Sequence, residues 1–367
     1  MIVYIIAIGI LFISYPLVNK KLYFSINFMI MSLLVGLRGD NIGSDTLRHI
    51  EFIRSAGEFD GIDSLLAVNE SIRIEIGNIL IMQLANSFGD VHLFFIISSF
   101  LTFGAIGIFA YKYTPNKDYW SVVFAIYAIG FFMYAMNATR QALAISLACN
   151  LYPYIKNNEK IKFSLLVALI AWLFHYSLLI MIPVVWFFSL KTCEINEENI
   201  FKIFFVSILK CIFGGIILCI FINAIIEFLP YGGYLLMASE FSRPSEGGWF
   251  NLFRGLGVLT MVLATLFISR NNNTSQNDLT NIYWCSVMAL MSIFFTILQL
   301  SFMNIFYRVI DTFNIYVCVL CVYFFQIAKP RYLLLLYRVV FIVVGVVCLY
   351  YMLSSGLNGV DQYNTYF

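Results

Sequence analysis

Residues 91–111 read VHLFFIISSFLTFGAIGIFAY, an apolar run without Asp, Glu, Lys or Arg. A helix of about 20 apolar residues is long enough to cross the hydrocarbon layer of a bilayer. Hydrophobic residues make up 61% of the 367-residue chain and charged residues only 11%. Comparable runs occur near 2–18, 22–37, 119–136, 138–155, 251–269, 279–299, 308–328 and 332–353, with a longer one at 200–229. The sequence therefore predicts an integral membrane protein.

The number of runs sets the fold class. We predict an all-α, polytopic membrane protein with about 12 transmembrane helices, which leaves little chain for a soluble domain. Residues 1–367 are therefore expected to form a single polytopic transmembrane domain. The formal net charge of +2 is too small to indicate a nucleic-acid partner. No zinc or nucleotide-binding motif occurs, so neither a metal nor a cofactor is expected.

Two segments do not fit simple spans. Residues 74–88 carry several amide side chains, and we predict an interfacial or re-entrant helix there. The apolar run 161–190 is too long for one span, so we predict two short helices that meet near His175. With these assignments the lysine-rich connections all fall on one side, which the positive-inside rule makes the cytoplasmic side. Two substantial loops, 38–75 and 229–250, then lie on the outer face.

Arginine is distributed differently from lysine. All eleven lysines are assigned to the cytoplasmic side or to spans near it, whereas eight arginines are assigned to the outer face: Arg38, Arg48, Arg54, Arg73, Arg140, Arg243, Arg254 and Arg308. A guanidinium group stays charged and pairs bidentately with phosphate, so it suits a fixed anion site. We predict an anionic ligand at the outer face. The alternative is that each arginine anchors its helix to lipid or pairs locally, as Arg308 could with Asp311.

His175 is the first candidate for chemistry, because it interrupts an apolar segment reading Trp172-Leu-Phe-His-Tyr-Ser177. An ionisable group inside a membrane segment is costly and is a functional candidate by default. The alternative is a histidine whose ring bonds a backbone carbonyl and merely breaks the helix.

A second candidate is the segment that leaves the second apolar run, Arg38-Gly-Asp40-Asn-Ile-Gly-Ser-Asp45-Thr46. Its glycines permit a tight backbone course, and its carboxylates suit general-base work. The alternative is an ordinary capped turn, with Asp45 as N-cap of a helix that begins at Thr46. Glu75 is a further candidate carboxylate, unless it simply occupies a favourable helix N-terminus.

Four motifs together resemble one family. They are Ile42-Gly-Ser-Asp-Thr46, Glu75-Ile-Gly77, Arg140-Gln-Ala-Leu-Ala144 and Phe174-His-Tyr-Ser177 followed by Pro183. This combination resembles EpsG-like proteins, which belong to the Wzy-type bacterial polysaccharide polymerases. The resemblance runs to about residue 190 and then weakens to Arg308 and the pattern of spans. In the family an aromatic residue commonly follows the acidic-glycine motif, whereas Arg48-His49 stands nearby here.

The resemblance implies a GT-C-like glycosyltransferase in the bacterial inner membrane, with its active site on the periplasmic side. It implies polymerisation of undecaprenyl-diphosphate-linked oligosaccharide repeat units into O-antigen, capsule or exopolysaccharide. The same kind of lipid-linked oligosaccharide is donor and acceptor, and a chain-length regulator is a further expected partner.

On this interpretation the catalytic residues are Arg140, which stabilises the leaving diphosphate, and either His175 or Asp45 as base. Residues expected to bind diphosphate or sugar are Arg38, Asp40, Glu75, Gln141, Arg254 and Arg308. Two alternatives remain. A lipid-linked oligosaccharide flippase should show cations along a central path and two related halves. A membrane sugar O-acyltransferase should have a cytoplasmic acyl-donor site.

Overall fold

The computed structural model describes residues 2–57, 74–115, 118–188, 195–228, 248–270, 274–301, 306–327, 331–356 and 365. Within a few of these helices only the backbone is described, namely at 215–228, 248–252, 300–301, 306–308 and 331–333. Throughout the described residues the regular structure is helical, apart from one isolated bridge between Arg38 and Thr365. The expectation of an all-α fold is confirmed.

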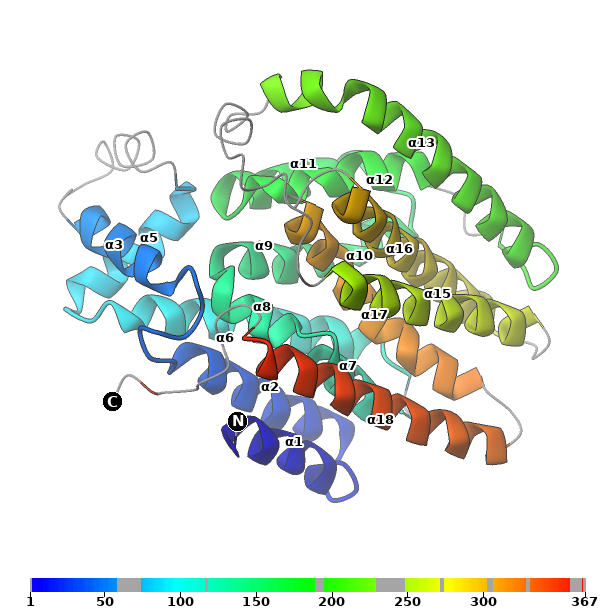
Figure 1. Ribbon diagram of the computed structural model, residues 1–367, viewed down its shortest axis with the longest axis horizontal. Coiled ribbons are helices and arrows are strands. Elements are labelled where there is room, and N and C mark those ends of the chain that lie inside the picture. Colours follow the sequence, from blue (N-terminus) through cyan, green and yellow to red (C-terminus); the bar gives the residue numbers. More distant parts are fainter. Residues whose placement is uncertain are drawn as a thin grey trace. The chain divides into compact units, whose positions relative to one another are not determined.

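The chain packs as two units, one formed by Met1–Val185 with Pro330–Phe367 and the other by Trp186–Lys329. The helices of the first unit are α1 Ile2–Ser14, α2 Lys20–Gly36, α3 Thr46–Gly57, α5 Ile76–Ser87, α6 His92–Tyr113, α7 Trp120–Ala128, α8 Phe131–Asn137, α9 Thr139–Cys149, α10 Tyr152–Lys156, α11 Lys160–Leu173, the 3-10 helix η1 Tyr176–Ile180, and α18 Arg331–Ser354. Helix α12, Met181–Phe188, runs across the boundary. In this unit α6 packs against both α2 and α9 (Figure 1).

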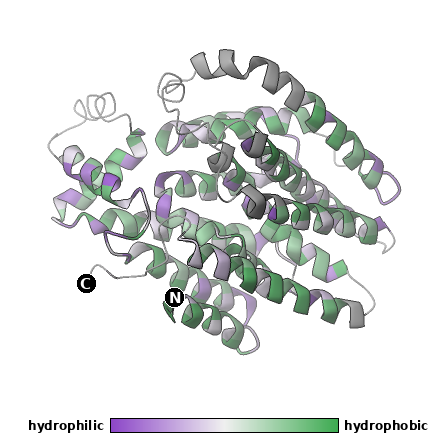
Figure 2. Ribbon diagram, in the orientation of Figure 1, coloured by the Kyte–Doolittle hydropathy of each residue, from purple (hydrophilic) through white to green (hydrophobic). Residues whose placement is uncertain are grey.

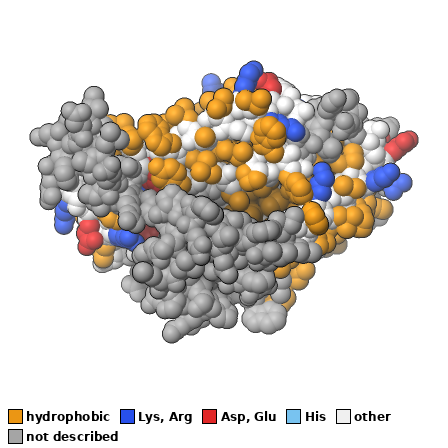
Figure 3. All heavy atoms as spheres, turned by 90° about the horizontal axis from the view of Figure 1, so that it is seen from above, with side chains coloured by type: hydrophobic (Ala, Val, Ile, Leu, Met, Phe, Trp, Pro, Cys, Tyr) orange, Lys and Arg blue, Asp and Glu red, His pale blue; other side chains and the backbone are white. Residues whose placement is uncertain are grey.

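Five described helices are long and apolar enough to cross a membrane: His92–Tyr113, Phe253–Arg270, Gln276–Gln299, Val309–Ile327 and Leu334–Ser354. A bent pair, α7 with α8, makes a sixth if it counts as one span. Apolar residues dominate these helices along their length (Figure 2). On the face drawn in Figure 3, apolar side chains are widespread among the described residues and charged side chains are few. The protein is therefore a multi-pass membrane protein, and the figure of about 12 spans stays a prediction.

The run 119–136, predicted as one span, does not form one straight helix. Helices α7 and α8 meet at an angle of 51°. Gly130 lies between them with φ of +82°, in the left-handed region that glycine adopts without strain. A Cβ at this position would come within 2.8 Å of the sulfur of Met352. The bend therefore needs glycine for its backbone conformation, and the flexible side chain of Met352 in α18 packs close to it.

The expected span 138–155 is interrupted as well. Helix α9 ends at Cys149, and the side-chain nitrogen of Asn150 donates to the carbonyl oxygens of Ala105 at 2.9 Å and Ser146 at 3.1 Å. Such side-chain bonds to the backbone compete with helix continuation. The short α10 follows, with Pro153 in its first turn, where the missing N–H costs nothing. Apolar composition predicted both runs but not their interruptions.

Both unusual segments form short helices, and the interfacial or re-entrant placement of the first stays a prediction. Residues 76–87 form α5, whose 12 residues extend about 18 Å, short of a bilayer core. The run 161–190 divides into α11 and the pair η1 and α12, with the break at Phe174 and His175. The long run 200–229 forms one helix of 29 residues, α13 Ile200–Phe228.

Side-chain contacts within the first unit lie at both ends of α2. The ammonium group of Lys20 donates to the carbonyl oxygen of Thr114, and Arg338 pairs with Asp118. Lys20, Thr114 and Asp118 lie in connections that the lysine pattern assigns to one side. At the other end of α2, Arg38 bonds Thr139. Which end faces the cytoplasm stays a prediction.

The second unit contains α13, α15 Gly248–Arg270, α16 Gln276–Ser301 and α17 Phe306–Ile327. Helices α16 and α17 pack along each other and against α15. Between them the hydroxyl of Ser292 donates to Asn314 Oδ1 at 2.8 Å, and Asn314 Nδ2 donates to Asp311 Oδ1 at 2.6 Å. The buried carboxylate of Asp311 also interacts electrostatically with Arg254 of α15.

Candidate functional site

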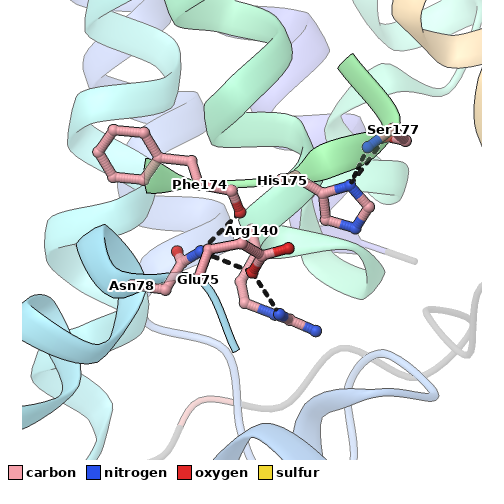
Figure 4. A network of polar contacts seen from close by, with 6 residues as sticks. All are labelled: Glu75, Asn78, Arg140, Phe174, His175 and Ser177. Carbon is pink, nitrogen blue, oxygen red and sulfur yellow. Dashed lines mark hydrogen bonds and ion pairs between the residues drawn. The ribbon is translucent and has the colours of Figure 1, made fainter. Parts of the chain in front are cut away.

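An ion pair links two of the sequence motifs at the ends of α5 and α9. The Nη1 of Arg140 lies 2.7 Å from Oε2 of Glu75 (Figure 4). Glu75 immediately precedes α5, and Arg140 is the second residue of α9. The two residues are 65 positions apart in sequence, so their contact depends entirely on the packing of these helices.

The Phe174–Ser177 motif contacts the Glu75–Arg140 ion pair at the end of α11. A helix end leaves backbone carbonyls without intrahelical donors. Asn78 Nδ2 donates to the carbonyl oxygen of Phe174 at 2.6 Å and to Glu75 Oε2 at 3.3 Å. Gly77 permits this approach, because a Cβ on it would lie 2.6 Å from the carbonyl oxygen of Leu173. The Glu75-Ile-Gly77 motif thus places a carboxylate against the break in α11.

His175 lies at that break with an extended backbone, φ −166° and ψ 119°. Its Nδ1 is 2.8 Å from the hydroxyl of Ser177, and the Ser177 backbone N–H donates to the same nitrogen at 3.3 Å. Gln141 Nε2, one residue beyond Arg140, donates to the Ser177 hydroxyl at 2.7 Å. The first turn of α9 therefore supports both the ion pair and the histidine.

The ion pair is largely withdrawn from solvent. The side chain of Glu75 is 4% exposed and that of Arg140 is 20% exposed. Burial raises the pKa of Glu75 above its ordinary value, and the positive charge of Arg140 offsets part of that rise. Among the described residues, Nε of Arg140 is buried without a hydrogen-bond partner. Because a guanidinium carries five N–H donors, this arginine can pair with Glu75 and still offer donors to an anion.

The Ile42–Thr46 motif packs against the junction between α8 and α9, which precedes Arg140. Gly43 has φ of +88°, and a Cβ there would lie 2.5 Å from the carbonyl oxygen of Met136. The side-chain oxygen of Asn137 accepts from the Ser44 hydroxyl at 2.7 Å and from the Asp45 backbone N–H at 3.0 Å. Helix α3 begins at the next residue. The half-buried Asp45 is thus brought to the α8–α9 junction.

Arg38 contacts protein groups on three elements. Its guanidinium donates to the carbonyl oxygen of Val35 at 2.7 Å, to the Thr139 hydroxyl at 2.9 Å and to the Thr46 hydroxyl at 3.3 Å. The residue is fully buried, and its guanidinium carbon lies 4.2 Å from the centre of the Phe95 ring. These contacts join the end of α2 to the starts of α3 and α9. Arg38 therefore organises the backbone on which Arg140 is placed.

We expect Arg38→Lys to destabilise the first unit strongly. Lysine has no planar fork, so it cannot serve three acceptors on three elements at once. Each lost bond to a charged group is worth about 1.5–3 kcal/mol. The thermal midpoint of the purified chain in detergent measures the effect. Arg54→Lys is the matched control, because Arg54 is exposed on α3, and an equal midpoint for both variants contradicts the role given to Arg38.

The remaining predicted residues lie elsewhere. Asp40 is 54% exposed, and its Oδ1 lies 3.2 Å from Nε2 of His92. Arg254 and Arg308 belong to the second unit, as the seventh residue of α15 and the third of α17. The side chain of Arg308 lies outside the described residues, as do positions 229–247 of the predicted loop 229–250 and positions 58–73 of the loop 38–75.

Sequence reasoning did not anticipate three polar residues that assemble the site. In the sequence, Asn78 only adds to the polarity of its segment, Asn137 has no distinguishing pattern, and Ser177 is part of the histidine motif. Each forms hydrogen bonds between segments far apart in sequence. A polar residue at a helix break, beside an expected charged residue, is the one signal that could have indicated them.

The comparison with known families agrees with this geometry. A family model described as the EpsG family matches residues 21–366. The chain belongs to the EpsG family. Membership indicates a membrane protein of the polysaccharide-polymerase type, and it extends the resemblance from the first 190 residues through the second unit. No curated protein and no solved structure is similar enough to this EpsG-family chain to be matched.

Proposed function

We propose that this EpsG-family protein is a GT-C-like glycosyltransferase with about 12 spans that works on the periplasmic face of the bacterial inner membrane. It joins oligosaccharide repeat units carried on undecaprenyl diphosphate into O-antigen, capsule or exopolysaccharide. The observation that carries the proposal is the buried Glu75–Arg140 pair, which places a guanidinium at the start of α9, where the next residue, Gln141, bonds the Ser177 partner of His175.

Arg140 binds the diphosphate of the donor in this mechanism. Glu75 holds one edge of the guanidinium, so the remaining donors have a set direction before substrate arrives. The positive end of the α9 dipole adds to the attraction for an anion. Such preorganised charge stabilises a leaving group without reorganisation during the reaction.

The reaction forms one bond and breaks one. The acceptor hydroxyl oxygen attacks the anomeric carbon of the donor sugar, and the bond between that carbon and the diphosphate oxygen breaks with its electron pair on the diphosphate. The hydroxyl proton passes to a base, for which Asp45 and His175 are the candidates. Asp40, Gln141, Arg254 and Arg308 are proposed to contribute to binding of sugar or diphosphate, whereas Arg38 acts through the backbone it supports.

Both substrates are lipid-linked, which suits a protein whose site lies at helix ends in apolar surroundings. A chain-length regulator is proposed as a further partner. The interpretation as a polymerase requires that repeat units reach the outer face by another protein.

The test is a gel of surface polysaccharide from cells that lack the gene, complemented with wild type or His175→Ala. We expect the deletion to show a single lipid-linked repeat unit where wild type shows a ladder, and His175→Ala to resemble the deletion. Absence of any displayed unit in the deletion contradicts the proposal and indicates a flippase. An intact ladder that has lost only acyl groups indicates an O-acyltransferase.

A further inference from the structure

The hydrogen bonds at His175 determine which ring nitrogen carries the proton. The Ser177 backbone N–H can only donate, and it donates to Nδ1 at 3.3 Å. By this bond His175 acts as the N-cap of η1, with Nδ1 in the place of the usual side-chain oxygen. A ring nitrogen that accepts a hydrogen bond is the unprotonated one of the neutral imidazole.

The second partner of Nδ1 agrees with this assignment. The Ser177 hydroxyl lies 2.8 Å from Nδ1 and receives a hydrogen bond from Gln141 Nε2 at 2.7 Å. With its oxygen accepting from the amide, the hydroxyl hydrogen is available for Nδ1. Gln141, Ser177 and His175 then form a chain in which every donor points toward the ring.

We infer that neutral His175 carries its proton on Nε2 and acts as a hydrogen-bond donor to the diphosphate oxygen of the sugar donor, not as the base for the acceptor hydroxyl. This inference rests on the proposed function. Nε2 lies on the edge of the ring that points away from Ser177 (Figure 4). As the anomeric C–O bond breaks, the electron pair moves to the diphosphate oxygen, and the Nε2–H bond to that oxygen strengthens.

A proton on Nε2 of His175 decides between His175 and Asp45 as the base. A neutral imidazole with its proton on Nε2 has no lone pair on the edge turned from Ser177, so it cannot take a proton there. The hydroxyl proton then passes to the carboxylate of Asp45. Ser177 and Gln141 are positioning residues, because they act on the substrate through the ring of His175.

The proton position is measured directly by nitrogen NMR of the full chain, labelled with ¹⁵N-histidine and reconstituted in lipid vesicles. The sequence contains three histidines, so the His175 signals are obtained by difference from His175→Gln. We expect a protonated Nε2 and an unprotonated Nδ1 at neutral pH. Ser177→Ala should shift population toward the Nδ1-protonated form, since only the weaker backbone bond then selects the tautomer. A protonated Nδ1 in the wild type overturns the inference.

The second test measures the polymer yield of His175 variants. Glutamine can place an N–H donor near the position of Nε2 but cannot exchange protons, whereas asparagine reaches only to the position of Nδ1. We expect His175→Ala and His175→Asn to lower polymer yield by about 10²–10³-fold and His175→Gln to recover about ten-fold of that loss. Equal inactivity of all three contradicts the donor role.

The two tests separate this inference from the function on which it rests. If the Nε2-protonated form is observed but the deletion strain still forms polymer, the proposed polymerase function fails while the tautomer stands. If the deletion abolishes polymer but Nδ1 carries the proton, the polymerase function stands and His175 is available as the base.

Discussion

Arg140→Ala is expected to abolish polymer while leaving the protein inserted and folded. The variant removes the guanidinium that we propose binds the diphosphate, and loss of one such electrostatic group typically lowers the rate by about 10²–10³-fold. Glu75 would be left buried without its partner, but its pKa is already raised by burial, so it can take up a proton and lose its charge. The measurement is a gel of surface polysaccharide together with the amount of protein in the membrane fraction.

Three further variants make this test specific. Arg140→Lys keeps the charge but loses the fork that can serve Glu75 and a phosphate together, so we expect it to recover only a small part of the activity. Glu75→Gln keeps a side chain of the same shape and loses the pairing, so activity should fall less than in Arg140→Ala. Arg48→Ala is the matched control, because Arg48 lies on α3, exposed, with its guanidinium 5.3 Å from the Phe52 ring. Normal chain lengths in Arg140→Ala would remove Arg140 from the mechanism.

Gly77→Ala is expected to disable the site through the backbone. The added Cβ would lie 2.6 Å from the carbonyl oxygen of Leu173 and 3.0 Å from the ring of Phe174. Helix α5 must then move away from α11, which breaks the bond from Asn78 to Phe174 and displaces Glu75. Overpacking of this kind costs about 1–3 kcal/mol. We expect a lower thermal midpoint and loss of most polymer.

Gly104→Ala provides the matched control for this variant. Gly104 lies within α6, and a Cβ there would meet nothing within 4 Å. Alanine favours a helix interior over glycine by about 1 kcal/mol, so this variant should keep or raise the midpoint and form normal polymer. Similar behaviour of the two variants would show that the approach of α5 to α11 is not tight.

The sequence predicted which residues belong to the candidate site better than it predicted which of them contact one another. Each of Asp45, Glu75, Arg140 and His175 is a polar residue beside or within an apolar run, and polarity in such surroundings is visible in the sequence. The structure joins the segments of Glu75, Arg140 and His175 through direct hydrogen bonds and brings Asp45 to the adjoining junction. Arg38, like Arg140, is an arginine at the edge of an apolar run. In the structure its guanidinium donates to protein acceptors on α2, α3 and α9.

The sequence by itself determined the membrane class, the helical composition, the break at His175 and the family. These properties depend on hydrophobicity and on local motifs, which a linear pattern carries directly. Only the tertiary structure decided where α7 bends, where α9 ends, and which carboxylate meets Arg140. The bend uses the positive φ of Gly130, which apolar composition does not reveal, and the end of α9 coincides with a bond from Asn150 to Ala105, far away in sequence. Such pairings follow from packing, and no local pattern records them.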